Sequence, residues 1–145
     1  MSELITEQKL KEFGRDYVKI LVRELKREGK DATGRLINSI DYRLREDANN
    51  IFIVIESVDY LKWVDEGRKR GTYPPIRPLI EWTKVKGLPK SAAYGIQKNI
   101  FKFGIKPTRV IQRVINEFEN SPTLQRKYED EVVEQIINMV EQKFN

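Results

Sequence analysis

The segment from Tyr60 to Pro78 constrains the fold of this chain more than any other, because it combines two glycines, three prolines and a cluster of cations. Proline fixes φ and lacks a backbone donor, while glycine permits sharp turns, so neither a long helix nor a central strand can run through this segment. An amphipathic stretch precedes the stiffened basic loop. We interpret the whole segment as an element for assembly with other molecules.

The chain has 145 residues and contains neither histidine nor cysteine. Its length predicts a single domain that buries roughly two-thirds of the surface exposed by the unfolded chain. The absence of both residue types removes the usual general base, the commonest zinc ligand and any disulfide or thiolate metal site. We therefore expect a non-enzymatic protein without a cofactor or metal, whose function depends on its surface and shape.

No segment of the chain is predicted to enter a membrane. The longest uninterrupted apolar run, Ile51 to Ile55, is much shorter than the roughly 20 residues that span a bilayer. The first residues also lack the basic region that begins a signal peptide. We expect a protein that is made in the cytoplasm and has no membrane partner.

Positive charge is concentrated in the middle of the chain. Residues 61–113 contain 13 Lys and Arg and 3 acids, whereas residues 1–60 contain 11 and 12, and residues 114–145 contain 3 and 7. The formal net charge of +5 therefore conceals a middle of +10 between flanks of −1 and −4. Such a middle can attract phosphate groups or the acidic end of an identical neighbour.

The first half of the chain predicts a helix followed by a hairpin. Apolar residues recur at three- and four-residue steps from about Glu3 to Glu28, as in an amphipathic helix. Residues 40–45 then alternate between apolar and charged, which is the period of a half-buried strand. The turn formers of residues 47–50 lead into Ile51 to Ile55, a strand that we expect to be buried on both faces.

Helices are predicted throughout the second half. Prolines mark their beginnings and glycines mark their ends, and apolar residues four apart define their buried faces. In the helix of residues 92–103, the shared apolar face is predicted to hold Ala92, Ile96, Ile100 and Phe103. The predicted helices run from Ile76 to near Gly87, from Ala92 to Phe103, from Arg109 to Phe118 with Thr108 as N-cap, and from Ser121 to Phe144.

Two groups of cations are candidate binding residues. The first lies in the glycine- and proline-rich loop and is expected to contact DNA phosphates or an acidic subunit face, the alternative being a solvated loop. The second forms a basic helix stripe almost without acidic partners, which favours a negatively charged environment over an ordinary solvated helix face. The loop group is Arg68, Lys69, Arg70 and Arg77, and the stripe is Lys98, Lys102, Lys106 and Arg109, within a wider bias that includes Lys84, Lys86, Lys90 and Arg113.

Other candidate site residues favour structural roles. Asp65 and Glu66 are adjacent acids, but neighbours on a strand face opposite ways and the next acid is Glu81, so we expect a salt bridge or inter-subunit pair rather than a metal site. The glycines match no phosphate-binding motif. Aromatic residues in this region can stack on bases, although their apolar neighbours favour packing. These aromatic residues are Tyr60, Trp63, Tyr73 and Trp82.

Two short motifs follow the N-terminal amphipathic helix in order. The first is Thr33-Gly34-Arg35-Leu36-Ile37-Asn38-Ser39-Ile40 and the second is Tyr60-Leu61-Lys62-Trp63-Val64-Asp65-Glu66-Gly67. With this order, the chain resembles the neck and tail-completion proteins of tailed bacteriophages, a ring-forming family also described as head-tail joining proteins or minor tail components. Its second half departs from the family's common ending and is similar to proteins of phages that infect Bacteroidetes, including crAss-like phages. The motif and interface residues that the resemblance assigns are Thr33, Gly34, Leu36, Ser39, Tyr60, Trp63, Val64, Glu66 and Gly67.

The resemblance implies an α+β fold in which a small antiparallel sheet is packed by an N-terminal helix and several C-terminal helices. It implies one domain over residues 1–145, with a helical elaboration over about 76–145. It also implies a ring homo-oligomer in the virion neck that contacts the portal or other neck and tail proteins and surrounds genomic DNA. The alternative is a small basic nucleic-acid-binding protein that acts as a monomer or dimer. A small nuclease is disfavoured, because the acids do not cluster and histidine is absent.

Overall fold

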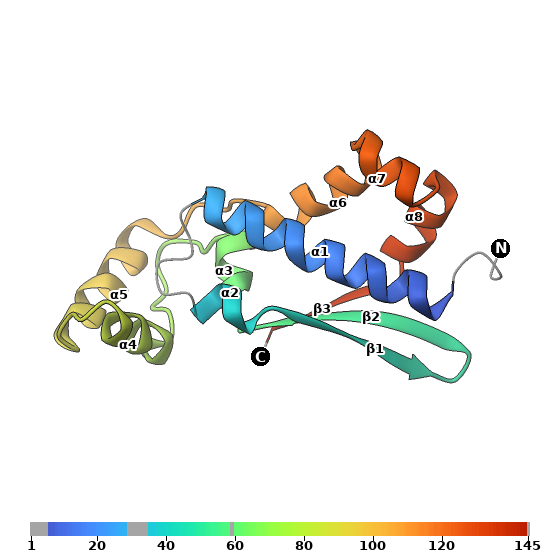
Figure 1. Cartoon of the computed structure of the whole chain (residues 1–145). Coiled ribbons are helices and arrows are strands. Elements are labelled where there is room, and N and C mark those ends of the chain that lie inside the picture. The colour runs from blue at the N-terminus through green and yellow to red at the C-terminus, as the bar shows by residue number, and fades with distance from the viewer. Residues whose placement is uncertain (1–5, 29–34, 59, 145) are drawn as a thin grey trace.

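The computed structural model describes residues 6–28, 35–58 and 60–144 and confirms the α+β class (Figure 1). Helix α1 crosses one face of a three-stranded sheet, and the remaining helices lie beyond the ends of the strands or beside α1. Within the described ranges, no helix combines the length and the apolar content needed to cross a bilayer. In chain order the elements are α1 (Glu7–Arg27), α2 (Arg35–Ser39), β1 (Asp41–Asp47), β2 (Asn50–Ser57), α3 (Tyr60–Glu66), α4 (Ile76–Val85), α5 (Ser91–Phe103), α6 (Val110–Asn120), α7 (Pro122–Lys127), α8 (Asp130–Ile137) and β3 (Val140–Phe144).

The sheet has the strand order β1-β2-β3 and is mixed. Strands β1 and β2 form the predicted antiparallel hairpin, which turns through Ala48 at a φ of 54°. Strand β3 pairs in parallel with β2, from Ile53 opposite Val140 to Ser57 opposite Phe144. The prediction of a purely antiparallel sheet is therefore wrong, because it lacked this third strand.

The predicted long C-terminal helix is also wrong, since residues 122–144 form α7, α8 and β3. The chain becomes extended at Tyr128, with φ of −124° and ψ of 126°, and a new helix begins after Glu129. The prediction failed at Val140 and Phe144 because residues four apart share a face in a strand as well as in a helix. Periodicity alone could not distinguish the two structures.

Aromatic rings fill the core between α1 and the C-terminal helices. Phe13 of α1 stacks on Phe118 of α6 with ring centres 4.1 Å apart, and Tyr128 meets Phe13 edge-on at 5.5 Å. The Tyr128 hydroxyl donates to Asp16 Oδ2 at 2.7 Å, and Gln142 Nε2 of β3 donates to the Tyr17 hydroxyl at 2.9 Å. Burial raises the pKa of both phenols. These contacts confirm the predicted apolar face of the N-terminal helix.

The central strand β2 is buried on both faces, as predicted. Ile53 and Ile55 point into the core under α1, and Val54 on the opposite face is also fully buried. In the strand register Val54 lies between Arg43 and Glu141. On that outer face Arg43 Nε pairs with Glu56 at 2.9 Å and Arg45 Nη2 pairs with Glu141 at 2.7 Å. Charged side chains therefore cover the outer face of the sheet.

Gly14 sets the distance between α1 and the hairpin. It is buried in the middle of α1, where a Cβ atom would lie 2.8 Å from Cγ of Tyr42 in β1. This approach is tighter than side-chain packing permits, so an added methyl group would have to displace the Tyr42 ring. Glycine at this position thus allows α1 to lie directly against the Tyr42 ring of the hairpin.

We expect Gly14→Ala to lower the free energy of unfolding by about 1 kcal/mol, because overpacking exceeds the gain in helix propensity. Gly95→Ala is the matched control, since Gly95 is an exposed glycine of α5 with open space around its Cα. That variant should be unchanged or stabilised by roughly 0.5–1 kcal/mol. Urea denaturation of the three proteins measures both changes. Equal effects of the two substitutions would contradict the tight α1 contact.

Candidate interaction surface

Two antiparallel chain segments, residues 67–71 and 104–107, lie side by side, and we call them the stalk. Through the stalk the chain leaves and re-enters the rest of the molecule, which we call the body. Arg68 N–H donates to the Ile105 carbonyl and Ile105 N–H donates to the Arg68 carbonyl, both at 2.8 Å. Gly71 N–H adds a bond to the Phe101 carbonyl at 2.7 Å. The stalk supports residues 72–103, which contain α4 and α5 and which we call the arm (Figure 1).

Glycine is required on both sides of the stalk. Gly67 and Gly104 have φ values of 74° and 75°, in the left-handed region that favours glycine. A Cβ atom at Gly67 would lie 2.7 Å from the Pro107 nitrogen, and one at Gly104 would lie 3.0 Å from the Arg70 nitrogen. The two segments can therefore approach closely enough to pair only because both positions lack a side chain.

Arg68 faces inward and fastens the stalk to its surroundings. Its guanidinium carbon lies 5.1 Å from the centre of the Trp63 ring, and Nη2 donates to the Tyr73 carbonyl at 3.1 Å. Trp63 itself is buried in the middle of α3. The structure thus separates Arg68, which is half-buried, from its exposed neighbours Lys69 and Arg70.

Helices α4 and α5 pack against each other and form the predicted helical pair. Both end near glycines of positive φ, Gly87 and Gly104, as the sequence indicated. The interior of the arm is small: Pro74, Leu79, Thr83 and Ala93 are its buried residues among those described. A stacked ring pair and a hydrogen bond tie α5 to the chain before α4, namely Tyr73 with Phe101 at 4.2 Å and Gln97 Nε2 to the Pro74 carbonyl at 2.8 Å.

The outward face of α5 combines lysines with exposed aromatic rings. Lys102 lies one turn after Lys98 on this face, and Tyr94 lies one turn before Lys98. The exposed fraction of Tyr94 is 51%. Phe103 is 71% exposed, and Lys102 Nζ lies 5.3 Å from the centre of its ring. The prediction that Phe103 shares the buried face is wrong, because the chain turns away at Gly104 and leaves the last turn uncovered.

The cations of the arm and stalk are mostly unpaired, in contrast to those of the body. In the body, Arg and Lys residues form ion pairs of 2.6–2.8 Å: Arg23 with Glu117, Arg45 with Glu141, Arg113 with Glu28 and Lys127 with Asp16. Arg113, which the sequence placed in the basic region, belongs to this paired group. Over residues 67–109 as described, ten exposed cations form no ion pair: Lys69, Arg70, Arg77, Lys84, Lys86, Lys90, Lys98, Lys102, Lys106 and Arg109.

The predicted loop and stripe residues do not form two separate groups. Arg77 lies in the first turn of α4 rather than in the loop. Lys106 and Arg109 follow α5 in the returning segment, where Arg109 adopts a left-handed φ of 58° just before α6. Lys98 and Lys102 are the stripe members that occupy a helix. All of these cations except Arg68 are exposed, and those of α4 and α5 belong to the two helices that project from the rest of the molecule (Figure 1).

The motif residues of the first half occupy structural positions. Leu36 and Val64 are buried in the core, and the Ser39 hydroxyl accepts from Val58 N–H at 3.1 Å, which ties α2 to the end of β2. Tyr60 begins α3 and the exposed Glu66 ends it. Thr33 and Gly34 lie outside the described residues. The motifs therefore mark how the body is closed and where the stalk begins.

Asp65 caps a distant helix, a role that sequence analysis missed. Residues 60–66 form α3, not a strand, and Asp65 Oδ1 accepts from the Ile111 N–H of α6 at 3.0 Å. The predicted N-cap Thr108 instead donates its hydroxyl to the Val64 carbonyl at 2.6 Å. Burial raises the pKa of Asp65 above its usual value. Among the described residues, no three acidic side chains gather as a metal site.

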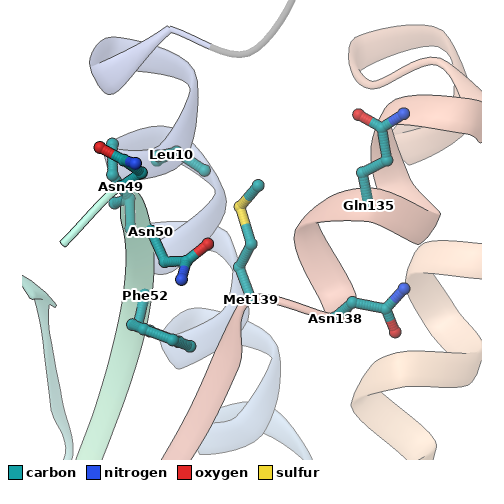
Figure 2. A pocket seen from close by; sticks show the side chains of 8 residues that line it. Leu10, Asn49, Asn50, Phe52, Gln135, Asn138 and Met139 are labelled. Carbon is teal, nitrogen blue, oxygen red and sulfur yellow. The ribbon is translucent and has the colours of Figure 1, made fainter. Parts of the chain in front are cut away.

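A groove of 390 Å³ lies at the opposite end of the molecule, beside the hairpin tip (Figure 2). It forms because β3 begins at Val140 opposite Ile53, so that residues 50–52 of β2 have no neighbouring strand on that side among the described residues. Its lining combines apolar side chains with amides, and Met139 lies at its centre in Figure 2. The lining residues are Leu10, Asn49, Asn50, Ile51, Phe52, Gln135, Asn138 and Met139. No signal in the sequence predicted this groove, because it depends on the unpredicted strand β3.

Comparison of the chain with protein-family models, with characterised proteins and with solved structures gave no match.

We expect Asp65→Ala to lower the free energy of unfolding by about 1 kcal/mol, because it removes the cap of α6. Asp65→Asn keeps an oxygen acceptor without a buried charge, so it should match or exceed the wild type at neutral pH. The folded state binds the Asp65 proton more tightly than the unfolded chain, so the contribution of this group to stability falls as pH rises through its raised pKa. Urea denaturation of the three proteins from acidic to neutral pH tests this. A loss in Asp65→Asn as large as in Asp65→Ala would contradict the capping role.

Proposed function

We propose that the chain is a structural, non-enzymatic subunit that assembles into a ring in the neck of a tailed-phage particle. There it connects the portal and head to the tail and surrounds the passage for DNA. The observation that carries this proposal is the arm, which projects from a closed body and exposes cations that form no ion pair with any described residue. A cationic projection of this kind suits negatively charged partners outside the chain.

The placement of the motif residues supports the same function. The N-terminal helix, the hairpin and α3 occur in the order that the resemblance to neck and tail-completion proteins implies. In the proposed ring this body is the repeated structural unit, and the arm contacts a neighbour. The proposed partners are identical copies, the portal or other neck and tail proteins, and genomic DNA bound without sequence preference. The proposed location is the virion, after assembly in the host cytoplasm.

We assign contact with the DNA passage to Lys69, Arg70 and Arg77. These three side chains are exposed at the stalk and at the start of α4, whereas Arg68 is occupied by Trp63 and the Tyr73 carbonyl. Cations that contact phosphates attract DNA without reading its sequence, and their effect weakens as salt increases. That behaviour suits a ring through which an entire genome passes.

A specific observation favours the second candidate, a free nucleic-acid-binding protein. Exposed Tyr94 and Phe103 flank Lys98 and Lys102 on α5, and aromatic rings among cations can stack unpaired bases. The two functions differ in what the isolated protein does. A ring subunit associates with itself or with a portal, whereas the alternative binds DNA as a monomer or dimer.

Light scattering of the purified protein, alone and with purified portal complexes, tests the proposed function. We expect a species larger than a dimer, or a stable complex with the portal. A monomer that ignores the portal but binds DNA with a steep dependence on salt would overturn the ring and favour the nucleic-acid module.

The Lys69→Glu, Arg70→Glu double variant tests the DNA-facing assignment. It should fold normally, because both side chains are exposed and form no ion pair, but it should reduce the number of DNA-filled particles. Arg15→Glu, Lys19→Glu is the matched control, since it makes the same charge change on two exposed residues of α1. Measurement of particle yield and packaged DNA compares them. Equal yields from both double variants would remove Lys69 and Arg70 from this role.

A further inference from the structure

Two surface features lie at opposite ends of the molecule, and their apolar and charged groups are complementary. The arm carries an exposed aromatic ring beside lysines. The groove at the hairpin tip has a partly apolar lining (Figure 2), and acids lie near it. We propose that Phe103 of one copy inserts into this groove of a second copy and that Lys98 and Lys102 face the acids at its rim. The proposal rests on the proposed ring, and it specifies which surfaces meet.

Phe103 has the properties of an interface anchor. It is the most exposed of the large hydrophobic side chains that the structure describes, and it stands on a helix that is held by the packing of the arm. Lys102 lies against its ring, with Nζ 5.3 Å from the ring centre. Binding energy at interfaces is concentrated in such aromatic residues when they enter a pocket. Asn99 and Gly95, one and two turns before Phe103 on the same row, leave room for a neighbour to approach.

The groove suits an aromatic ring in size and chemistry. Its volume of 390 Å³ lies within the range of roughly 300–1,000 Å³ that is typical of sites for small groups. Leu10, Ile51, Phe52 and Met139 supply an apolar lining, and the remaining lining residues are neutral amides. An entering ring would therefore desolvate no charged group of the lining, and the amides could adapt to its edge.

Exposed acids border the groove and complement the arm. Asp47 lies opposite Asn50 in the hairpin register. Glu134 lies one turn before Asn138 on α8, and its carbonyl accepts the Asn138 N–H. Glu134 forms no ion pair among the described residues, and Asp47 pairs with Arg45 at 3.7 Å. Charges of opposite sign at a rim orient two partners and speed their association more than they add affinity.

The positions of the two features favour a head-to-tail contact. The arm and the hairpin tip lie at opposite ends of α1 and the sheet, so one copy cannot use its own groove (Figure 1). A contact between two different surfaces of one chain repeats from copy to copy and closes into a ring when the rotation permits. One anchor and one groove per copy are therefore sufficient to build the proposed ring.

The first test compares Phe103→Glu with Leu88→Glu in sedimentation velocity at several protein concentrations. Both substitutions place a carboxylate at an exposed apolar position of the arm, but Leu88 lies in the connection between α4 and α5, off the contact face. Phe103→Glu should weaken self-association by about 30-fold or more, as loss of an interface anchor does. Leu88→Glu should associate like the wild type. Circular dichroism of both variants checks that they remain folded.

The second test mixes a variant without an anchor and a variant without a groove. Gln135→Trp fills the groove from an exposed position of α8 and leaves Phe103 intact, whereas Phe103→Glu leaves the groove intact. Each variant alone should be monomeric, and an equimolar mixture should form heterodimers that grow no further, because one compatible contact remains. This result would show that the anchor and the groove meet between copies.

The outcomes separate this inference from the function on which it rests. A wild type that forms large species while Phe103→Glu forms them equally well would overturn the contact and leave the ring intact. A wild type that stops at a dimer would overturn the head-to-tail arrangement. A wild type that never associates, alone or with a portal complex, would overturn the ring and the contact together.

Discussion

The backbone pairing of Arg68 with Ile105 is the constraint on which the two-part shape of this protein depends. It joins the two chain segments at the base of the arm. Two further backbone hydrogen bonds extend this pairing into the body, from Thr108 N–H to the Val64 carbonyl and from Arg109 N–H to the Asp65 carbonyl. Helices α3 and α6 can therefore pack in the body as if residues 72–103 were an insertion. The pairing requires glycine at positions 67 and 104, because a side chain at either position would clash with the opposite segment. These two glycines therefore determine where α4 and α5 project from the body.

The body and the arm also differ in how their charges are paired. The body satisfies its charges internally, both across the outer face of the sheet and between α1 and α6. The arm, with the stalk at its base, holds most of the excess positive charge in a small structure with four buried residues, and its exposed cations form no ion pair with the described residues. Its folding gains little from these cations, because surface charges of one sign repel one another. Their placement is better explained by an external partner than by stability.

Local signals predicted the parts of the fold that local physics determines. The spacing of Leu10, Phe13 and Tyr17 identified α1, the alternation and turn before Ile51 identified the hairpin, and glycines marked the ends of α4 and α5. The features that were missed depend on distant residues: β3 exists because β2 offers it an edge, and the cap of α6 comes from Asp65, 46 residues before Ile111. The candidate cations were found from composition, but only the fold separates the buried role of Arg68 from the exposed Arg70. The groove could not be predicted, since it depends on the end of β3.

The β1 edge of the sheet offers neighbours no easy alternative to the arm. Strand β1 is an edge strand, and Asp41, Arg43 and Asp47 line it with exposed charges, which oppose pairing of its edge with a strand from another copy. In the proposed ring, a single aromatic anchor with rim charges would give each contact modest strength, because area and affinity at such small interfaces are limited. Ring closure holds every subunit by two contacts, so the last contact forms within one assembly rather than between free molecules. Weak pairwise contacts combined with closure favour assembly on a template such as a portal over uncontrolled growth in solution.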